Sequence, residues 1–293
     1  MRQNIQEKAL ARCMEKNPAA RSFRVPSYGA KQAIATIVRV LLGVAVGLII
    51  WEICSLIFNA NGSTLGFPDP LSAFQRLGEY LFAGRPLYGH SIYEHIGTSI
   101  KRLLIAFGMA ASVGVVLGSL MGYFQRFYAI AIVPVAIYQM IPGLAWLPVA
   151  ILMFGLGDDS AIFMIFAVSS MVITIGVSGA IRTVPPVMVQ AAKMSGARPV
   201  TIFTRVLIPQ AACSIVNALR LGMSSGWRVL VAAEMIVGTG VGMGYSIQLA
   251  RDLLDYVGAF ACITVICLFG LFLDRVVLAS IERWMNRKLG ADQ

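Results

Sequence analysis

The sequence predicts an all-α, polytopic membrane protein with six transmembrane helices. Of its 293 residues, 58% are hydrophobic and only 13% are charged, whereas soluble proteins carry roughly 25% charged residues. The mean hydropathy of +0.76 points the same way. So few charges cannot cover the surface of a soluble domain of this length. We therefore exclude a soluble protein, a disordered chain and a secreted disulfide-rich domain.

Six apolar stretches account for the predicted spans, each close to the roughly 20 residues that a helix needs to cross a bilayer. They are residues 40–58, 103–124, about 134–155, 160–181, about 211–237 and about 257–280. Residues 127–157 are uncharged and contain Pro134, Pro142 and Pro148, so we predict one kinked span there, preceded by an interfacial stretch. The predicted organisation is a transmembrane domain over 40–285, with cytoplasmic tails 1–39 and 286–293.

Basic residues are distributed unevenly between the predicted loops. Seventeen Lys and Arg lie on the side of the N-terminus and five on the other side, where we place Lys101 and Arg102. The positive-inside rule then predicts that both termini are cytoplasmic, as in a multi-pass protein of a bacterial inner membrane. We attribute the net charge of +10 to orientation and to contact with membrane lipids rather than to nucleic acid.

Small residues recur at helical spacing within the spans. Gly114, Gly118 and Gly122 form two overlapping GxxxG steps, and Gly222 and Gly226 form another. Such steps let helix backbones approach closely in lipid. We expect ordinary packing within the chain, with a contact between subunits as the alternative.

The residues needed for common catalytic sites are missing. No lysine is followed by Ser or Thr, so the phosphate-binding Walker A motif is absent. The two histidines, His90 and His95, have neither zinc-protease spacing nor a partner set for nucleophilic catalysis. We expect a non-catalytic chain without a metal or cofactor of its own.

The most informative segment is the predicted cytoplasmic loop 181–213. Pro185-Pro186 can open a short helix, and Gly196 can end it with positive φ. Pro199 can start a second short helix that reaches about Val206, and Pro209 marks the entry to the fifth span. The pattern predicts a helix–turn–helix; a basic connector lying on lipid head groups is the alternative.

This loop resembles the E-A-A loop of permease subunits of binding-protein-dependent ABC importers. Gln190-Ala191-Ala192, three residues, Gly196, nine residues and then Val206-Leu207-Ile208-Pro209 reproduce the family spacing, with Gln in place of Glu at 190. Other stretches resemble the branch that transports nitrate, sulfonates, taurine and bicarbonate, namely residues 140–148, 227–235 and 242–245. The resemblance covers about residues 50–285.

The resemblance implies the type I ABC importer permease fold and translocation of a small anionic solute. It also implies separate ATPase subunits that bind ATP and Mg, an external binding protein (periplasmic or lipid-anchored), and a second permease, most simply another copy of this chain. By the same resemblance, the residues that couple to the ATPase are Gln190, Ala191, Ala192, Gly196 and Pro209. An ion-gradient-driven secondary transporter is the alternative, although its usual internal repeat is missing.

Charged residues inside a span are costly and favour a functional interpretation. Glu234 and Arg228 both fall in the predicted fifth span, but six positions separate them, so they lie on largely different faces of the helix. Packing is the alternative interpretation for the tryptophans. The candidate residues of the translocation pathway are Glu234, Arg228, Trp227, Trp146, Tyr138, Gln139 and Ser224.

Overall fold

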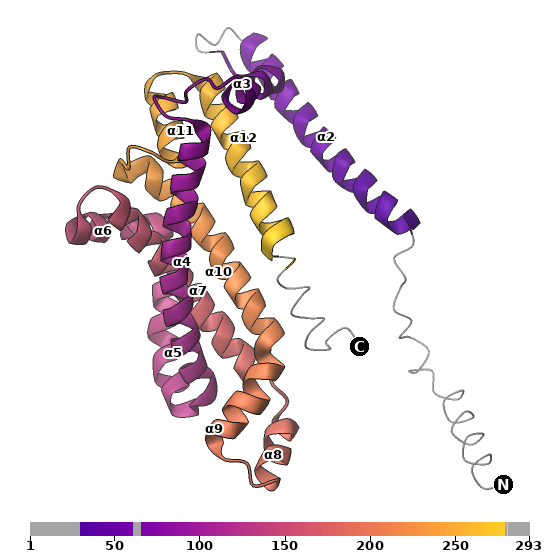
Figure 1. Cartoon of the computed structure of the whole chain (residues 1–293), viewed down its shortest axis with the longest axis vertical. Coiled ribbons are helices and arrows are strands. Elements are labelled where there is room, and N and C mark those ends of the chain that lie inside the picture. The colour runs from indigo at the N-terminus through magenta and orange to yellow at the C-terminus, as the bar shows by residue number, and fades with distance from the viewer. Residues whose placement is uncertain (1–29, 61–65, 279, 281–293) are drawn as a thin grey trace, which may run out of the picture. The chain divides into compact units, whose positions relative to one another are not determined.

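The computed structural model describes residues 30–60, 66–278 and 280 (Figure 1). These residues form helices and no β-strand, which confirms the all-α prediction. Residues 1–29 of the predicted N-terminal tail and the predicted C-terminal tail lie outside the described part. The helices are α2 (Ala30–Ala60), α3 (Pro70–Phe82), α4 (Ile92–Tyr123), α5 (Gln125–Met140), η2 (Gly143–Trp146), α6 (Leu147–Phe154), α7 (Asp158–Arg182), α8 (Pro186–Met194), α9 (Pro199–Ile202), η3 (Phe203–Leu207), α10 (Ile208–Val237), α11 (Met243–Asp252), α12 (Tyr256–Phe272) and η4 (Leu273–Leu278).

The chain divides into two compact units, residues 1–62 and residues 63–293. Helix α2 belongs to the first unit, and its segment Val38–Ala60 is long and apolar enough to cross a membrane. The second unit holds four further helices of this kind: α4, α7, the continuous run Pro199–Val237 and the segment Tyr256–Val276. With the bent pair α5–α6 counted as one span, the described residues give the six predicted spans.

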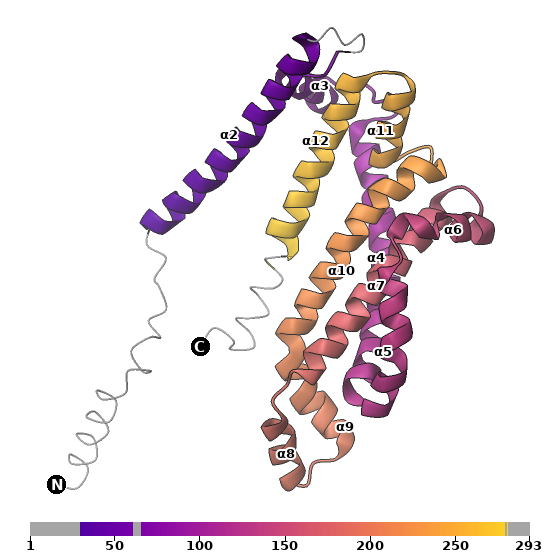
Figure 2. The same cartoon turned by 180° about the vertical axis from the view of Figure 1, so that it is seen from behind.

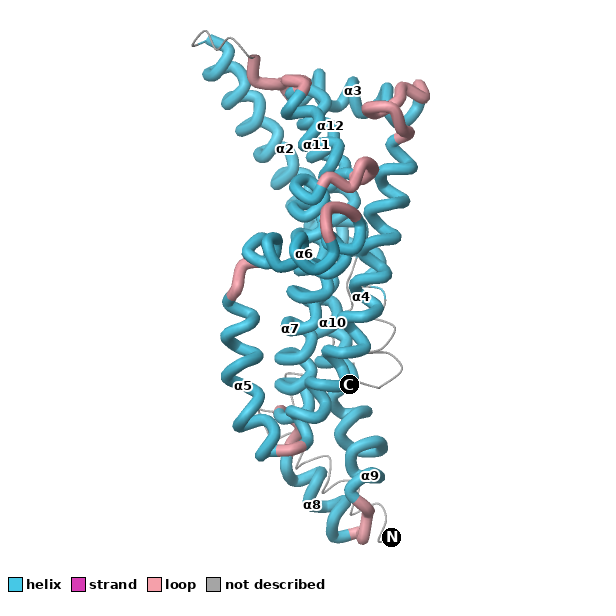
Figure 3. The backbone as a smooth tube through the Cα atoms, turned by 90° about the vertical axis from the view of Figure 1, so that its left-hand side faces the viewer, coloured by secondary structure: helices cyan, strands magenta, loops and turns pink. Residues whose placement is uncertain are grey.

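The third predicted span is kinked, as expected, but its helix begins earlier than predicted. Helix α5 already begins at Gln125 and contains Pro134, so the predicted interfacial stretch is helical. The break falls at Ile141, which is extended because it precedes Pro142. Beyond it, the segment Gly143–Phe154 turns by 97° from α5 (Figure 3).

Helix α7 packs between α4 and α10 at very short range (Figures 1 and 2). An added Cβ on Gly114 would lie 2.8 Å from the Ile173 Cβ, and one on Gly118 would lie 2.6 Å from the carbonyl oxygen of Thr174. On α10, a Cβ on Gly222 would lie 2.4 Å from Cγ1 of the same Ile173. The glycine steps in α4 and α10 therefore pack within the chain, as expected.

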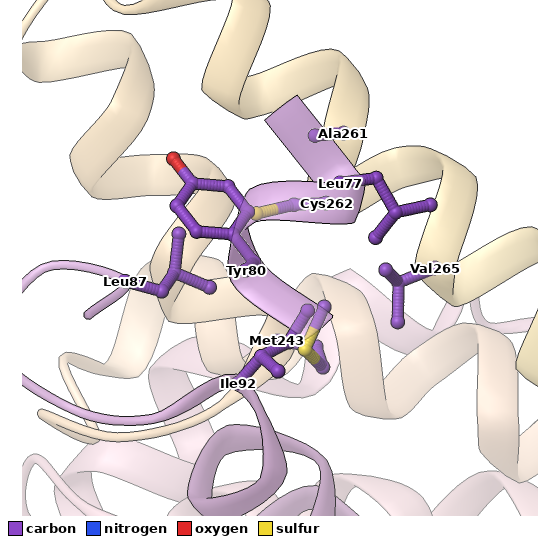
Figure 4. Packing of buried hydrophobic residues seen from close by; sticks show 8 residues of the cluster. All are labelled: Leu77, Tyr80, Leu87, Ile92, Met243, Ala261, Cys262 and Val265. Carbon is purple, nitrogen blue, oxygen red and sulfur yellow. The ribbon is translucent and has the colours of Figure 1, made fainter. Parts of the chain in front are cut away.

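A second cluster of buried residues joins α3 to α4, α11 and α12 (Figure 4); its members are Leu77, Tyr80, Leu87, Ile92, Met243, Ala261, Cys262 and Val265. Beside it, the Tyr88 hydroxyl donates a hydrogen bond to Asp255 at 3.0 Å. The same carboxylate accepts from the backbone N–H of Gly258 and so caps α12. Burial and the nearby Asp255 charge raise the pKa of Tyr88, which keeps its hydroxyl a donor.

We predict that Gly118→Ala loosens the contact between α4 and α7, because its Cβ has no room beside a backbone oxygen. Overpacking of this kind costs about 1–3 kcal/mol. Gly108 lies on the same helix, and a Cβ there meets nothing within 4 Å, so Gly108→Ala is the matched control. Thermal melting of the two purified variants in detergent should show a lowered midpoint for Gly118→Ala only. Equal midpoints would contradict the packing described here.

Candidate functional site

Glu234 of α10 is fully buried and lies at the centre of a polar network. Its carboxylate accepts a hydrogen bond from Nη1 of Arg102 at 2.7 Å, from the Ser99 hydroxyl at 2.8 Å and from the backbone N–H of Gly244 at 2.9 Å. Arg102 and Ser99 belong to α4, whereas Gly244 belongs to α11. The network therefore ties three helices together at the end of the bundle that carries α3 (Figure 1).

Arg102 makes contacts beyond Glu234, and only 3% of its side chain is exposed. Its Nη1 also donates to the Val241 carbonyl at 2.6 Å, and its Nη2 donates to Asp158 at 2.7 Å. Asp158 starts α7, and 55% of its side chain is exposed. The Arg102 guanidinium thus lies between the buried carboxylate of Glu234 and the half-exposed carboxylate of Asp158. Its charge offsets the cost of burying Glu234.

The chain between α10 and α11 approaches Glu234 only because it is rich in glycine. Gly238 and Gly240 have φ values of 66° and 75° and turn the chain back after α10. At Gly242, a Cβ would lie 2.6 Å from Cδ of Glu234. A side chain there would displace the carboxylate from its donors.

His95 of α4 contacts the same glycine-rich segment between α10 and α11. Its ring is buried, with Nε2 3.0 Å from the Leu87 carbonyl and Nδ1 3.0 Å from the backbone N–H of Gly242. A neutral ring with the proton on Nε2 satisfies both contacts. The described residues contain no group of three or more side chains able to hold a metal ion. The two ring contacts hold the Leu87 and Gly242 segments together.

The sequence predicts a loop at Arg102, whereas the structure places this residue inside α4. Helix α4 begins at Ile92, eleven residues before the predicted span, because Ser91 and Glu94 form a capping box. The Ser91 hydroxyl accepts from the backbone N–H of Glu94, and the Glu94 carboxylate accepts from that of Ser91. This S-x-x-E pattern is visible in the sequence and indicates that the helix starts here.

The other candidate pathway residues lie apart from this network. Tyr138 and Trp146 stack on each other with ring centroids 4.4 Å apart, and Trp227 packs on Phe269 of α12. The side chain of Arg228 is exposed; its hydrogen bond goes to the Ser225 hydroxyl at 3.3 Å. Gln139 is also exposed and Ser224 is half-buried.

The predicted helix–turn–helix is present at the opposite end of the second unit (Figure 1). Helix α8 closes with a Schellman motif, in which the N–H of Ala197 donates to the Ala192 carbonyl and the N–H of Gly196 donates to the Lys193 carbonyl. The φ of Gly196 is 76°, as predicted. Gln190, Ala191, Gly196 and Pro209 are exposed, and Ala192 is half-buried.

The second short helix does not end near Val206. Helix α9 continues through η3, a π-helical segment, directly into α10. Pro209 lies in the first turn of α10. The π-helical turn lies directly before this proline, and the helix runs on through both.

We predict that Arg102 and Glu234 are coupled in stability. Arg102→Gln leaves the buried Glu234 carboxylate without its cationic partner, which costs about 3–5 kcal/mol. Glu234→Gln should cost less, because Arg102 keeps its contact with Asp158. The double variant leaves neither charge unpaired, so its loss should be clearly smaller than the sum of the single losses. Thermal unfolding of the four proteins in detergent measures the coupling. Strictly additive losses would show that the two side chains do not support each other.

The sequence matches the family model of the binding-protein-dependent transport system inner membrane component over residues 114–287. A putative ABC transporter permease protein of Methanocaldococcus jannaschii is 33% identical over 235 residues, covering 79% of this chain and 85% of that protein. The taurine transport system permease protein TauC of Escherichia coli is 29% identical over 222 residues, covering 75% and 79%. The bicarbonate transport system permease protein CmpB of Synechococcus elongatus is 29% identical over 264 residues, covering 88% and 93%.

Among solved structures, an inward-facing MetNI methionine ABC transporter contains a chain that superposes with a TM-score of 0.59 at 18% identity. The match covers 66% of this chain and 95% of that one, and it shows a shared type I importer permease fold. The family model covers more than half of the chain, and the relatives include the taurine and bicarbonate permeases that the sequence resembles. The chain therefore belongs to the inner membrane components of binding-protein-dependent transport systems, as the non-catalytic permease subunit of an ABC importer.

Proposed function

We propose that two copies of this chain form the pathway of an importer for a small anionic solute, which an external binding protein delivers. The observation that carries the proposal is the exposed α8–Gly196–α9 turn, with Gln190 and Ala191 on its surface. A short helix that projects from the bundle in this way is suited to dock in a groove of another protein. The taurine and bicarbonate relatives support the class of solute.

Separate ATPase subunits, which bind ATP and Mg, contact α8 in this proposal. The α8 end of the bundle then faces the cytoplasm, together with both termini of the chain. The uneven distribution of Lys and Arg supports this orientation. Gln190 lacks the charge that the family motif carries at this position, so its contact with the ATPase is a neutral hydrogen bond.

Arg228 is the strongest candidate for contact with the solute. Its guanidinium is exposed on α10, and it forms no ion pair with any residue that the structure describes. The neighbouring Val229 lies against the η2 turn, where a Cβ on Gly143 would be 2.7 Å from its Cγ2. The stacked Tyr138 and Trp146 flank that turn, so aromatic and cationic groups occur in one region of the bundle.

This arrangement suits transient binding of an oxyanion. An arginine with few fixed partners can donate to an anion without first breaking an internal ion pair. In this proposal Gln139, Ser224 and Trp227 supply further donors along the same route. Glu234 has no exposed surface, and it acts by holding α10 against α4 through Arg102.

We predict that Arg228→Gln lowers uptake at least about tenfold, the expected loss for one charge-assisted hydrogen bond to the solute. Arg228→Lys should retain most of the uptake, because it keeps the charge. Arg251→Gln, at an exposed arginine of α11, is the control and should behave as wild type. Uptake of radiolabelled taurine, bicarbonate and nitrate by the assembled transporter measures the effect. Normal uptake by Arg228→Gln would remove this residue from the pathway.

We also predict that Gly196→Val abolishes coupling to the ATPase but not insertion into the membrane. A β-branched residue at positive φ costs at least about 1–2 kcal/mol, and it redirects α9 relative to α8. Gly84 has a similar φ of 65°, and a Cβ there also meets nothing within 4 Å. Gly84→Val, at the other end of the unit, is therefore the matched control.

Co-purification of the ATPase and uptake of solute should both fall in Gly196→Val and persist in Gly84→Val. Wild-type values for Gly196→Val would instead support the alternative, in which this loop is a basic connector lying on lipid head groups. Equal losses in the two variants would trace the effect to general backbone strain.

A further inference from the structure

An apolar groove of about 830 Å³ runs along the last turns of α4, near the α8 end of the second unit. Its walls come from α4 and from the α9–η3–α10 run, and they include Val116, Leu120, Phe124, Val200, Phe203 and Ile208. The polar side chains that line it are those of Ser119 and Tyr123. Since α4 is a candidate membrane span, this groove opens where acyl chains are the natural apolar ligand.

A second cavity, of about 590 Å³, lies directly beside the groove and beneath α8. It is lined by Gln190 and Lys193 of α8 together with apolar residues. Tyr123 and Pro199 line both hollows, and the Tyr123 hydroxyl donates to the Pro199 carbonyl at 3.3 Å. The apolar groove and the cavity lined by Lys193 therefore adjoin at the contact between Tyr123 and Pro199.

The surroundings of the two hollows are positively charged. Lys193 lines the cavity, Arg198 precedes the shared Pro199, and Arg126 follows Phe124 by two positions. All three side chains are exposed, and none forms an ion pair with a described residue. From 114 to 233 the sequence contains only two acidic residues, Asp158 and Asp159, both at the far end of α7. This arrangement favours an anionic group, and the phosphate of a lipid head group is such an anion.

We propose that these hollows form a binding site for one anionic phospholipid of the adjacent leaflet. Its acyl chains lie in the groove and its phosphate lies in the cavity beside Lys193. Basic pockets between membrane helices are suited to such head groups, and the division into apolar and cationic parts matches the two ends of a phospholipid. The bound lipid would brace α8 and α9 against α4, so its occupancy would set the tilt of the exposed turn.

The first test addresses the head group. The purified full-length chain is equilibrated with mixed micelles of phosphatidylglycerol and phosphatidylcholine, and native mass spectrometry counts the retained lipids. Wild type should retain phosphatidylglycerol in preference. Lys193→Gln should lower that retention about fivefold, the loss expected for one lysine–phosphate contact. Lys101→Gln, at an exposed lysine near the other end of α4, should leave it unchanged.

The second test addresses the acyl chains. Val116 lines the groove, whereas Val113 is also exposed on α4 but lies outside the lining. Val116→Trp should fill the groove and remove the retained lipid, while Val113→Trp should not. Equal retention of the two lipids by wild type, or equal losses in variant and control, would overturn the proposal.

A photocross-linker placed at position 116 identifies the occupant directly. Attachment to phospholipid supports the site. Attachment to the N-terminal unit of the same chain or to a second copy would overturn it, because a protein segment would then fill the groove. These measurements need neither transport nor an ATPase, so they stand apart from the proposed function.

Discussion

A carboxylate buried among packed helices has few ways to remain stable, and burying one without a partner costs several kcal/mol. Glu234 meets this constraint with Arg102, a serine hydroxyl and a backbone N–H. These donors come from different helices, so the requirement of one charge fixes how α4, α10 and α11 approach each other. The same requirement explains the glycine at position 242 between α10 and α11, because any side chain there would occupy the place of the Glu234 carboxylate.

The end of the second unit that carries α8 and α9 differs from the end that carries the polar network. There α8 and α9 carry exposed apolar and basic side chains with few internal partners. The polar network ties three helices together at one end, while the turn at Gly196 leaves the other end available for contacts from outside the chain. This division suits a permease, whose helices must keep their arrangement while an ATPase and a solute bind to it.

The span pattern and the Gly196 turn could be predicted from the sequence because both depend on local properties, namely apolar runs and a positive φ. The ion pair of Arg102 and Glu234 could not, because 132 positions separate its members and no local pattern links them. The capping box at Ser91 would have moved the start of α4 and placed Arg102 inside the helix. Three prolines lie in the third span, and the sequence does not indicate that the helix breaks at Pro142 while Pro134 stays inside α5.

The close contact of α4, α7 and α10 also bears on how the subunit can move. Glycine backbones leave almost no side-chain layer between these helices, so sliding one past another would force atoms into overlap. The three helices must then travel as one solid block. Relative movement within the second unit is then expected outside this block, for example at the 97° bend between α5 and the segment Gly143–Phe154.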